Sequence, residues 1–291
     1  MSLKLARVIE LPFLLPGRIV SLPGRGEMFV RHHQHADPKA PTLLLLHGWT
    51  ASVDTQFFAT YETLSSTYSI IGVDHRGHGR GLRPNVAFSL EDCADDAAAV
   101  VRALGVTSVC TVGYSMGGPI SMLVWMRHPE LVQGMVLQAT ALEWNGTVKE
   151  RARWKMSRYF APLFRKLSSP RVIQFGVSRL IPRGHETHRF VPWLLGETRR
   201  NDAWIIHQAG QALAKFDATS FASSIPVPVS YVLTLRDRLV PPHKQRALAA
   251  ATNAHVIELD GDHFVSLEQL GDYAAATRQA VDVVTAQFSQ Q

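Results

Sequence analysis

Cysteine is scarce in this 291-residue sequence, and apolar runs of membrane-spanning length are missing. The two cysteines, Cys93 and Cys110, are too few for a disulfide framework or a cysteine-based metal site, and they predict two buried, reduced thiols. The longest apolar stretches, such as residues 227–235, are far shorter than the roughly 20 residues that cross a bilayer. Near the N-terminus, Glu10 and Pro12 interrupt an apolar segment and no small-residue cleavage site follows, so we expect a mature chain in the cytoplasm.

Positive charge is concentrated in one part of the chain. The net charge is +6, and residues 147–171 contain eight basic side chains against a single acidic one, Glu150. The basic residues are Lys149, Arg151, Arg153, Lys155, Arg158, Arg165, Lys166 and Arg171. No aromatic platform or fold signature of a nucleic-acid-binding protein accompanies them, so nucleic acid is not an expected partner. Two interpretations stay open: a solvated face, or a surface with weak, salt-sensitive attraction to anionic membranes that would place the chain peripherally at a membrane.

Short apolar runs alternate with helix-like stretches, which predicts βα units on a mainly parallel sheet. Strands are expected at residues 27–32, 42–47, 69–74, 108–114, 133–139, 227–235 and 254–259, and helices at residues 54–66, 90–104, 116–127, 242–251 and 266–287. The alternation breaks between about residues 141 and 224, where no good strand candidate occurs. We therefore expect an α/β core formed by residues 1–140 and 225–291, with an inserted helical lid (cap) at residues 141–224.

The strongest local signal is Gly113-Tyr114-Ser115-Met116-Gly117, which follows an apolar run and precedes a helix-like stretch. In that setting G-x-S-x-G forms a nucleophile elbow, a tight strand-to-helix turn that presents the serine hydroxyl at the end of the sheet. An ordinary glycine turn is the alternative, and the flanking strand and helix patterns argue against it. The motif therefore predicts Ser115 as a nucleophile.

Around this motif the sequence resembles the α/β-hydrolase superfamily, over roughly residues 27–139 and 225–288. His47-Gly48-Trp49 is similar to the family's turn after an apolar strand, and residues 74–79 are similar to its D-x-R-G-x-G turn. The resemblance implies an α/β-hydrolase fold, with a mostly parallel central sheet covered by helices on both faces. It also implies an oxyanion hole formed by the backbone N–H groups of Trp49 and Met116.

A serine hydroxyl needs an adjacent base, and the base needs an orienting partner. The superfamily orders these residues as serine, acid and histidine along the chain. His263 follows the predicted strand 254–259 and is the expected base, whereas His255 lies inside that strand. Asp237 follows the predicted strand 227–235 and opens a turn similar to the family's D-x-x-V-P acid turn. Glu143 is the alternative acid, because some family members carry the acid after the preceding strand.

The resemblance implies a serine hydrolase of the carboxylesterase or lipase type, which cleaves small to medium, largely apolar esters through an acyl-enzyme. Carbon–carbon bond hydrolysis, lactone hydrolysis and acyl transfer use the same three residues and stay open, as does a non-catalytic small-molecule receptor of the same fold. No cofactor or metal is expected, because no G-x-G-x-x-G follows the first strands and the histidines at 32, 33 and 35 lack other ligand groups nearby. Residues expected to line the pocket are Tyr114, Trp144, Trp154, Phe160 and Phe264.

Overall fold

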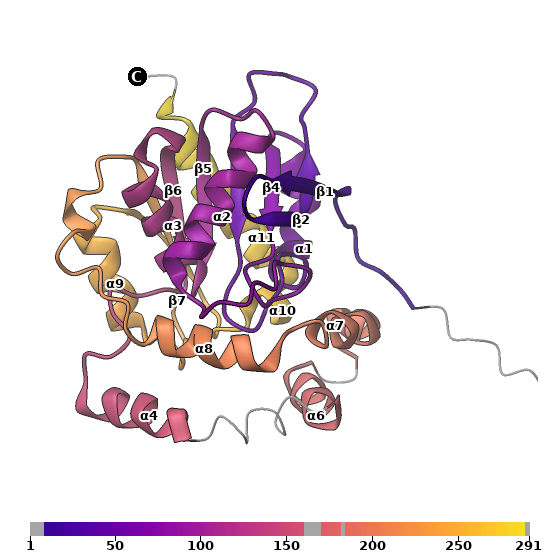
Figure 1. The fold of residues 1–291 in the computed structure, drawn as a ribbon, viewed down its shortest axis with the longest axis vertical. Coiled ribbons are helices and arrows are strands. Elements are labelled where there is room, and N and C mark those ends of the chain that lie inside the picture. Colours follow the sequence, from indigo (N-terminus) through magenta and orange to yellow (C-terminus); the bar gives the residue numbers. More distant parts are fainter. Residues whose placement is uncertain (1–8, 160–169, 182–183, 289–291) are drawn as a thin grey trace, which may run out of the picture.

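The computed structural model describes residues 9–159, 170–181 and 184–288, and its centre is an eight-stranded sheet (Figure 1). The strands lie in the order β1-β2-β4-β3-β5-β6-β7-β8. The pairings β1–β2 and β2–β4 are antiparallel, and the pairings from β4 through β8 are parallel. The strands are β1 (Gly17–Leu22), β2 (Gly26–His33), β3 (Thr42–Leu46), β4 (Ser69–Val73), β5 (Val109–Tyr114), β6 (Val132–Gln138), β7 (Val229–Thr234) and β8 (His255–Leu259).

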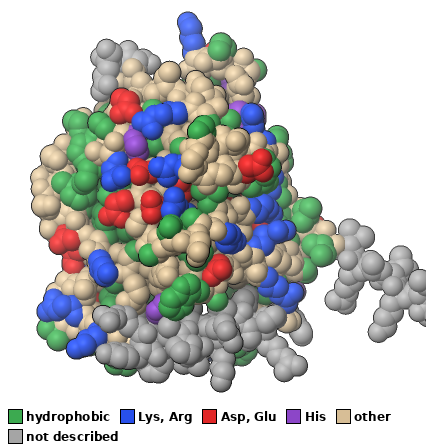
Figure 2. Space-filling model, viewed as in Figure 1, with side chains coloured by type: hydrophobic (Ala, Val, Ile, Leu, Met, Phe, Trp, Pro, Cys, Tyr) green, Lys and Arg blue, Asp and Glu red, His purple; other side chains and the backbone are tan. Residues whose placement is uncertain are grey.

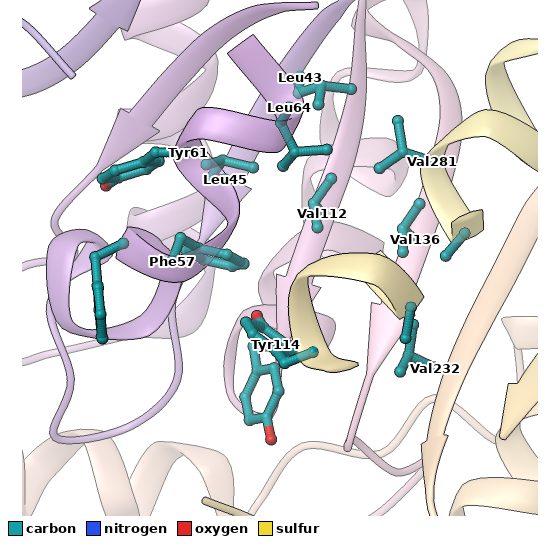
Figure 3. Packing of buried hydrophobic residues seen from close by; sticks show 14 of the residues in the cluster. Leu43, Leu45, Phe57, Tyr61, Leu64, Val112, Tyr114, Val136, Val232 and Val281 are labelled. Carbon is teal, nitrogen blue, oxygen red and sulfur yellow. The ribbon is translucent and has the colours of Figure 1, made fainter. Parts of the chain in front are cut away.

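Helices cover both faces of the sheet. They are α1 (Val53–Ser65), α2 (Leu90–Ala103), α3 (Gly117–Arg127), α9 (Pro242–Ala251), α10 (Val265–Glu268) and α11 (Leu270–Thr285). Consecutive side chains of a strand point to opposite faces, so Leu43 and Leu45 of β3 pack with α1 and α11, as Figure 3 shows. Leu44 and Leu46 of the same strand pack with α2 and α3. All four leucines are fully buried, which explains why the central strands read as continuous apolar runs.

The predicted fold class is confirmed, and the seven expected strands are present with ends that differ by at most two residues. Strand β1 is not predicted by the sequence. It is an antiparallel edge strand in which only Val20 and Leu22 are buried, so it lacks an apolar run. The long helix expected at residues 266–287 is divided into α10 and α11, because the backbone at Gln269 leaves the helical region, at φ −141° and ψ 69°.

The described parts of the chain between β6 and β7 form helices and, apart from one isolated bridge, no strand. These helices are α4 (Val148–Tyr159), α6 (Pro170–Leu180), α7 (Val191–Thr198) and α8 (Ala203–Leu213), and they lie below the sheet in Figure 1. The two ends of this segment meet at an antiparallel bridge between Glu143 and Asp217, beside which the Ala218 N–H donates to the Leu142 carbonyl at 2.8 Å. The segment therefore leaves and re-enters the sheet domain at one place, and its division from the core at residues 141 and 224 stays a prediction.

Two of the basic residues of this segment lie exposed on α4. Lys155 and Arg151 on α4 are exposed, and Figure 2 shows a group of basic side chains at the lower left, where α4 lies in Figure 1. Glu150 instead pairs with Lys244 of α9 at 2.7 Å, which ties α4 to the sheet domain. Across the described ranges, no helix combines the length and the apolar character needed to span a membrane.

Candidate active site

Ser115 lies in a tight turn between β5 and α3. Its φ is 51°, in the left-handed region, which costs a non-glycine residue about 1–2 kcal/mol. Two hydrogen bonds hold the turn: the Ser115 N–H donates to the Gln138 carbonyl at 2.8 Å, and the Gly118 N–H donates to the Ser115 carbonyl at 2.9 Å. The side chain is thereby presented at the end of the sheet, at the start of a helix.

The two glycines of the motif are required by close approach of backbone. A Cβ atom on Gly113 would collide with the carbonyl of Gly117 and with the hydroxyl of Ser121. A Cβ atom on Gly117 would collide with the carbonyl of Leu46, at the end of the neighbouring strand β3. The G-x-S-x-G pattern thus follows from packing the turn against β3 and α3.

His263 joins Ser115 to Asp237 in a chain of hydrogen bonds. Its Nε2 lies 3.1 Å from Ser115 Oγ, and its Nδ1 lies 2.7 Å from Asp237 Oδ2. His263 follows β8 and is held by its neighbours: its carbonyl accepts from the Tyr114 hydroxyl at 2.8 Å, and its N–H donates to Asp262 Oδ1 at 2.7 Å. Because a carboxylate only accepts, Nδ1 carries the proton and Nε2 is left to accept from the serine hydroxyl.

Asp237 is buried and accepts several hydrogen bonds besides that from His263. Its Oδ1 accepts from the N–H groups of Leu239 and Val240 at 2.9 and 2.7 Å. Its Oδ2 accepts from the Thr234 hydroxyl at 3.0 Å and from Gln245 Nε2 at 3.3 Å. These donors fix the carboxylate and satisfy its charge, so it can hold one orientation of the imidazole.

Glu143, the alternative acid, lies elsewhere. Its carboxylate pairs with Lys244 at 3.3 Å and accepts from the Asn145 N–H at 3.2 Å. Asp237 is the carboxylate that contacts the His263 ring, so the structure favours the later of the two acid positions.

The two residues expected to supply oxyanion donors flank Ser115. Met116 is the N-terminal cap residue of α3, and the first N–H groups of a helix have no acceptor within the helix. Trp49 follows Gly48, where an added Cβ atom would lie 3.3 Å from Ser115 Cβ. The turn after β3 therefore lies directly against the serine, and helix polarity at α3 favours negative charge there.

A cavity of 370 Å³ opens onto Ser115 and His263. Its lining is mostly apolar or uncharged and consists of Gly48, Trp49, Thr50, Ala51, Thr55, Gln56, Tyr114, Ser115, Gly176, Val177, Leu180, Leu194, Thr198, His263, Phe264, Ser266 and Leu267. Of the residues predicted to line the pocket, Tyr114 and Phe264 are in this lining and Phe160 lies outside the described residues.

Trp144 and Trp154 are not in this lining, as far as the described residues define it. Trp154 packs behind Trp49, with ring centroids 6.1 Å apart, and its indole N–H donates to the Trp144 carbonyl at 2.9 Å. The wall is formed instead by Val177 and Leu180 of α6 and by α7. The three-residue spacing of these two apolar residues is a sequence signal that could have indicated this wall.

Three buried histidines, His47 in the turn after β3 and His75 and His78 in the turn after β4, pack against one another. His47 Nε2 accepts from the His75 N–H at 2.9 Å, so its Nδ1 carries the proton and donates to the Gly48 carbonyl at 2.8 Å. Burial lowers the pKa of His75 to about 3 and that of His78 to about 4, and it also lowers that of His47. Neighbouring Asp74 is also buried, which raises its pKa to about 6. Among the described residues, no three His, Cys, Asp or Glu side chains are arranged to hold a metal ion.

Known proteins match this chain either over about a third of its length at higher identity or over most of its length at lower identity. The 2-(acetamidomethylene)succinate hydrolase of Mesorhizobium japonicum is 33% identical over 96 residues, which cover 33% of this chain and 34% of that protein. The match thus spans about a third of that relative's length. A putative carbamate hydrolase, RutD, of Serratia proteamaculans is 26% identical over 249 residues, or 79% of this chain and 86% of that protein.

Solved structures share the fold at low sequence identity. The enol-lactonase of Burkholderia xenovorans LB400 superposes with a TM-score of 0.76 at 20% identity, covering 92% of this chain and all of that one. The esterase EaEST of Exiguobacterium antarcticum gives 0.77 at 19% identity, covering 93% of this chain and all of that one. The family model described as the alpha/beta hydrolase fold matches residues 41–270. That match covers most of the sheet and the elbow, and the chain belongs to the α/β-hydrolase family.

Proposed function

We propose that this protein is a serine hydrolase that cleaves carboxylic esters through an acyl-enzyme. The observation that carries the proposal is the chain of hydrogen bonds from Ser115 through His263 to Asp237, in which Ser115 and His263 line the cavity. A serine hydroxyl becomes nucleophilic when a neighbouring imidazole accepts its proton, and a fixed carboxylate stabilises the imidazolium that forms. In this proposal Ser115 is the nucleophile, His263 the base and Asp237 the orienting acid.

The reaction then proceeds in two halves. Ser115 Oγ bonds to the ester carbonyl carbon while its proton passes to His263 Nε2, and the carbonyl electron pair moves onto oxygen. The N–H groups of Trp49 and Met116 stabilise that oxygen, since donors already in position need no reorganisation. When the intermediate collapses, the C–O bond to the alcohol breaks and the alcohol leaves with the proton from His263. Water repeats the sequence on the acyl-enzyme and releases the acid.

The cavity supports a small to medium, largely apolar substrate. Its volume of 370 Å³ lies at the small end of ligand sites, and Val177, Leu180, Leu194 and Phe264 supply apolar surface. Because α6 and α7 provide much of this wall, we assign residues 141–224 the role of a cap over the pocket. Lactone or carbon–carbon bond hydrolysis and acyl transfer use the same residues, and the ester is preferred as the simplest substrate that fits.

The test is a screen of p-nitrophenyl esters of increasing acyl length, with wild-type protein and Ser115→Ala. We expect the highest kcat/KM for short to medium chains, and a loss of several orders of magnitude in Ser115→Ala. Lack of turnover of every ester would favour the receptor of the same fold. A preference for the longest chains would contradict the small pocket while leaving the nucleophile assignment intact.

A further inference from the structure

Helix α8 holds the side chain of Trp49, the residue whose backbone N–H is proposed as an oxyanion donor. The Trp49 indole N–H donates to the Ile206 carbonyl of α8 at 2.8 Å. One turn further along, a Cβ atom added to Gly210 would lie 2.8 Å from the Trp49 ring. The indole is therefore held against α8 by a hydrogen bond to Ile206 and by close contact with Gly210. The close contact is possible because residue 210 has no Cβ atom.

The residue after Trp49 is held from the same direction. Asn201, just before α8, donates from Nδ2 to the Thr50 carbonyl at 2.6 Å and accepts from the Gly79 N–H at its Oδ1 at 2.8 Å. Thr50 has φ 67°, a left-handed conformation that a threonine rarely adopts unless its surroundings impose it. The Asn201 amide thus bridges the turn after β3 and the turn after β4.

The peptide group that carries the Trp49 N–H is also held by the buried side chain of His47. The Gly48 carbonyl belongs to that same peptide and accepts from His47 Nδ1 at 2.8 Å. Because His47 holds the Gly48 carbonyl and α8 holds the Trp49 indole, the peptide group between Gly48 and Trp49 has little freedom to rotate. Stabilisation of an oxyanion depends on donors at about 2.7–3.1 Å from the position of the developing charge, so a small rotation would weaken it.

We propose that α8 sets the position of the Trp49 N–H, and that Asn201 and Gly210 are positioning residues for oxyanion stabilisation. Neither residue is in the lining of the cavity. The proposal rests on the proposed function, because it takes Trp49 as an oxyanion donor. It predicts that the inserted segment controls kcat from α8, beyond its role in forming the pocket wall.

The experiment compares Gly210→Ala with Gly196→Ala in the full chain. Gly196 lies in α7 of the same segment, and a Cβ atom there meets nothing within 4 Å, which makes it a matched control. Alanine has a higher helix propensity than glycine, so neither change weakens its helix. The readouts are kcat and KM for p-nitrophenyl butyrate, and the affinities of a trifluoromethyl ketone and of the methyl ketone of the same chain length.

The trifluoromethyl ketone forms an oxyanion with the serine, whereas the methyl ketone reports ground-state binding. In Gly210→Ala we expect kcat and the affinity for the trifluoromethyl ketone to fall together by about 10- to 100-fold, up to the lower end of the loss measured when an oxyanion donor is removed. KM and methyl ketone affinity stay within about 3-fold of wild type, since the reduced binding is confined to the transition state. Gly196→Ala behaves as wild type in all four measurements.

Asn201→Asp keeps the acceptor for the Gly79 N–H and removes the donor to Thr50, and it provides the second test if Gly210→Ala does not fold. We expect the same selective loss. Equal kcat and equal trifluoromethyl ketone affinity in folded Gly210→Ala and Gly196→Ala would overturn the proposal, as would a loss of both ketones in parallel. Full activity of Ser115→Ala would instead refute the proposed function itself.

Discussion

Replacement of Asp237 by asparagine isolates the orienting role of the acid, because the hydrogen bonds around the carboxylate dictate how the amide must lie. The N–H groups of Leu239 and Val240 both point at Oδ1, so the amide oxygen is retained there. The amide NH₂ then takes the place of Oδ2 and faces His263 Nδ1, which lies 2.7 Å from that atom in the wild type. His263 must accept at Nδ1 and carry its proton on Nε2, where it can no longer accept from Ser115.

Neighbouring groups oppose any other arrangement. The reverse orientation would point the amide NH₂ at the N–H groups of Leu239 and Val240, which lie 2.9 and 2.7 Å from Oδ1. In the orientation described above, only the longer contact becomes unfavourable, because Gln245 Nε2, 3.3 Å from Oδ2, is also a donor. The wrong tautomer of a triad histidine lowers kcat by about 10⁴-fold. This corresponds to a loss of about 5 kcal/mol of transition-state stabilisation, at about 1.4 kcal/mol for each factor of ten.

The assay is kcat for a short p-nitrophenyl ester, with circular dichroism and thermal melting to show that Asp237→Asn is folded. Asp262→Asn is the matched control: Asp262 accepts from the N–H groups of Arg238 and His263, but it does not contact the imidazole. We expect its kcat to stay within about 10-fold of wild type, because only these two backbone hydrogen bonds are weakened. Near-normal kcat in folded Asp237→Asn, or inactivation by Glu143→Gln instead, would refute the reasoning.

Three further predictions concern stability and surface binding. Burial lowers the pKa of His78 from its ordinary 6.5 to about 4 in the folded protein. As the pH falls below about 6.5, the unfolded chain therefore binds a proton that the folded protein does not, and the free energy of unfolding decreases. At pH 5 this decrease amounts to about 2 kcal/mol. In urea denaturation, the difference in the free energy of unfolding between pH 7 and pH 5 should be smaller by that amount in His78→Asn, and unchanged in His255→Asn at an exposed position. The same difference in His78→Asn as in the wild type would contradict this. Gly117→Ala should lower the free energy of unfolding by on the order of 3 kcal/mol or prevent folding, because its Cβ meets the backbone of β3, whereas Gly271→Ala, which has open space, should not; equal stability of the two variants would be inconsistent with the elbow packing. If the basic face of α4 attracts membranes, anionic vesicles should co-sediment the protein at low salt and release it at high salt, and Lys155→Glu should weaken this; no sedimentation at low salt would remove the membrane role.

The central sheet could be predicted from sequence because local patterns determine it. Strands buried on both faces, such as Thr42–Leu46, appear as apolar runs, and Gly113 and Gly117 mark the two positions of the turn where a Cβ atom would collide with backbone. The edge strand Gly17–Leu22 is not predicted because its three apolar residues, Ile19, Val20 and Leu22, are interrupted by Ser21 and form no run like those of the central strands.

The surroundings of the serine depend on contacts between distant parts of the chain. Trp49 is hydrogen-bonded to Ile206 across 157 positions, and the pocket wall comes from α6 and α7, which carry no motif. Trp144 and Trp154 are expected in the pocket wall as apolar residues of the inserted segment, but residue type does not indicate which side chains of that segment face the cavity. Packing decides that, and it is visible only in three dimensions.

The central claim is that Ser115 is the nucleophile, and covalent labelling tests it most directly. A fluorophosphonate should modify the wild-type protein at a single site, with the adduct located on Ser115 by mass spectrometry of the digested protein. Ser266, another serine in the lining of the same cavity, should remain unmodified because His263 does not activate it. Ser115→Ala should show no labelling on the same timescale. Labelling of Ser115→Ala at the wild-type rate, or an adduct on Ser266 in the wild type, would contradict the assignment.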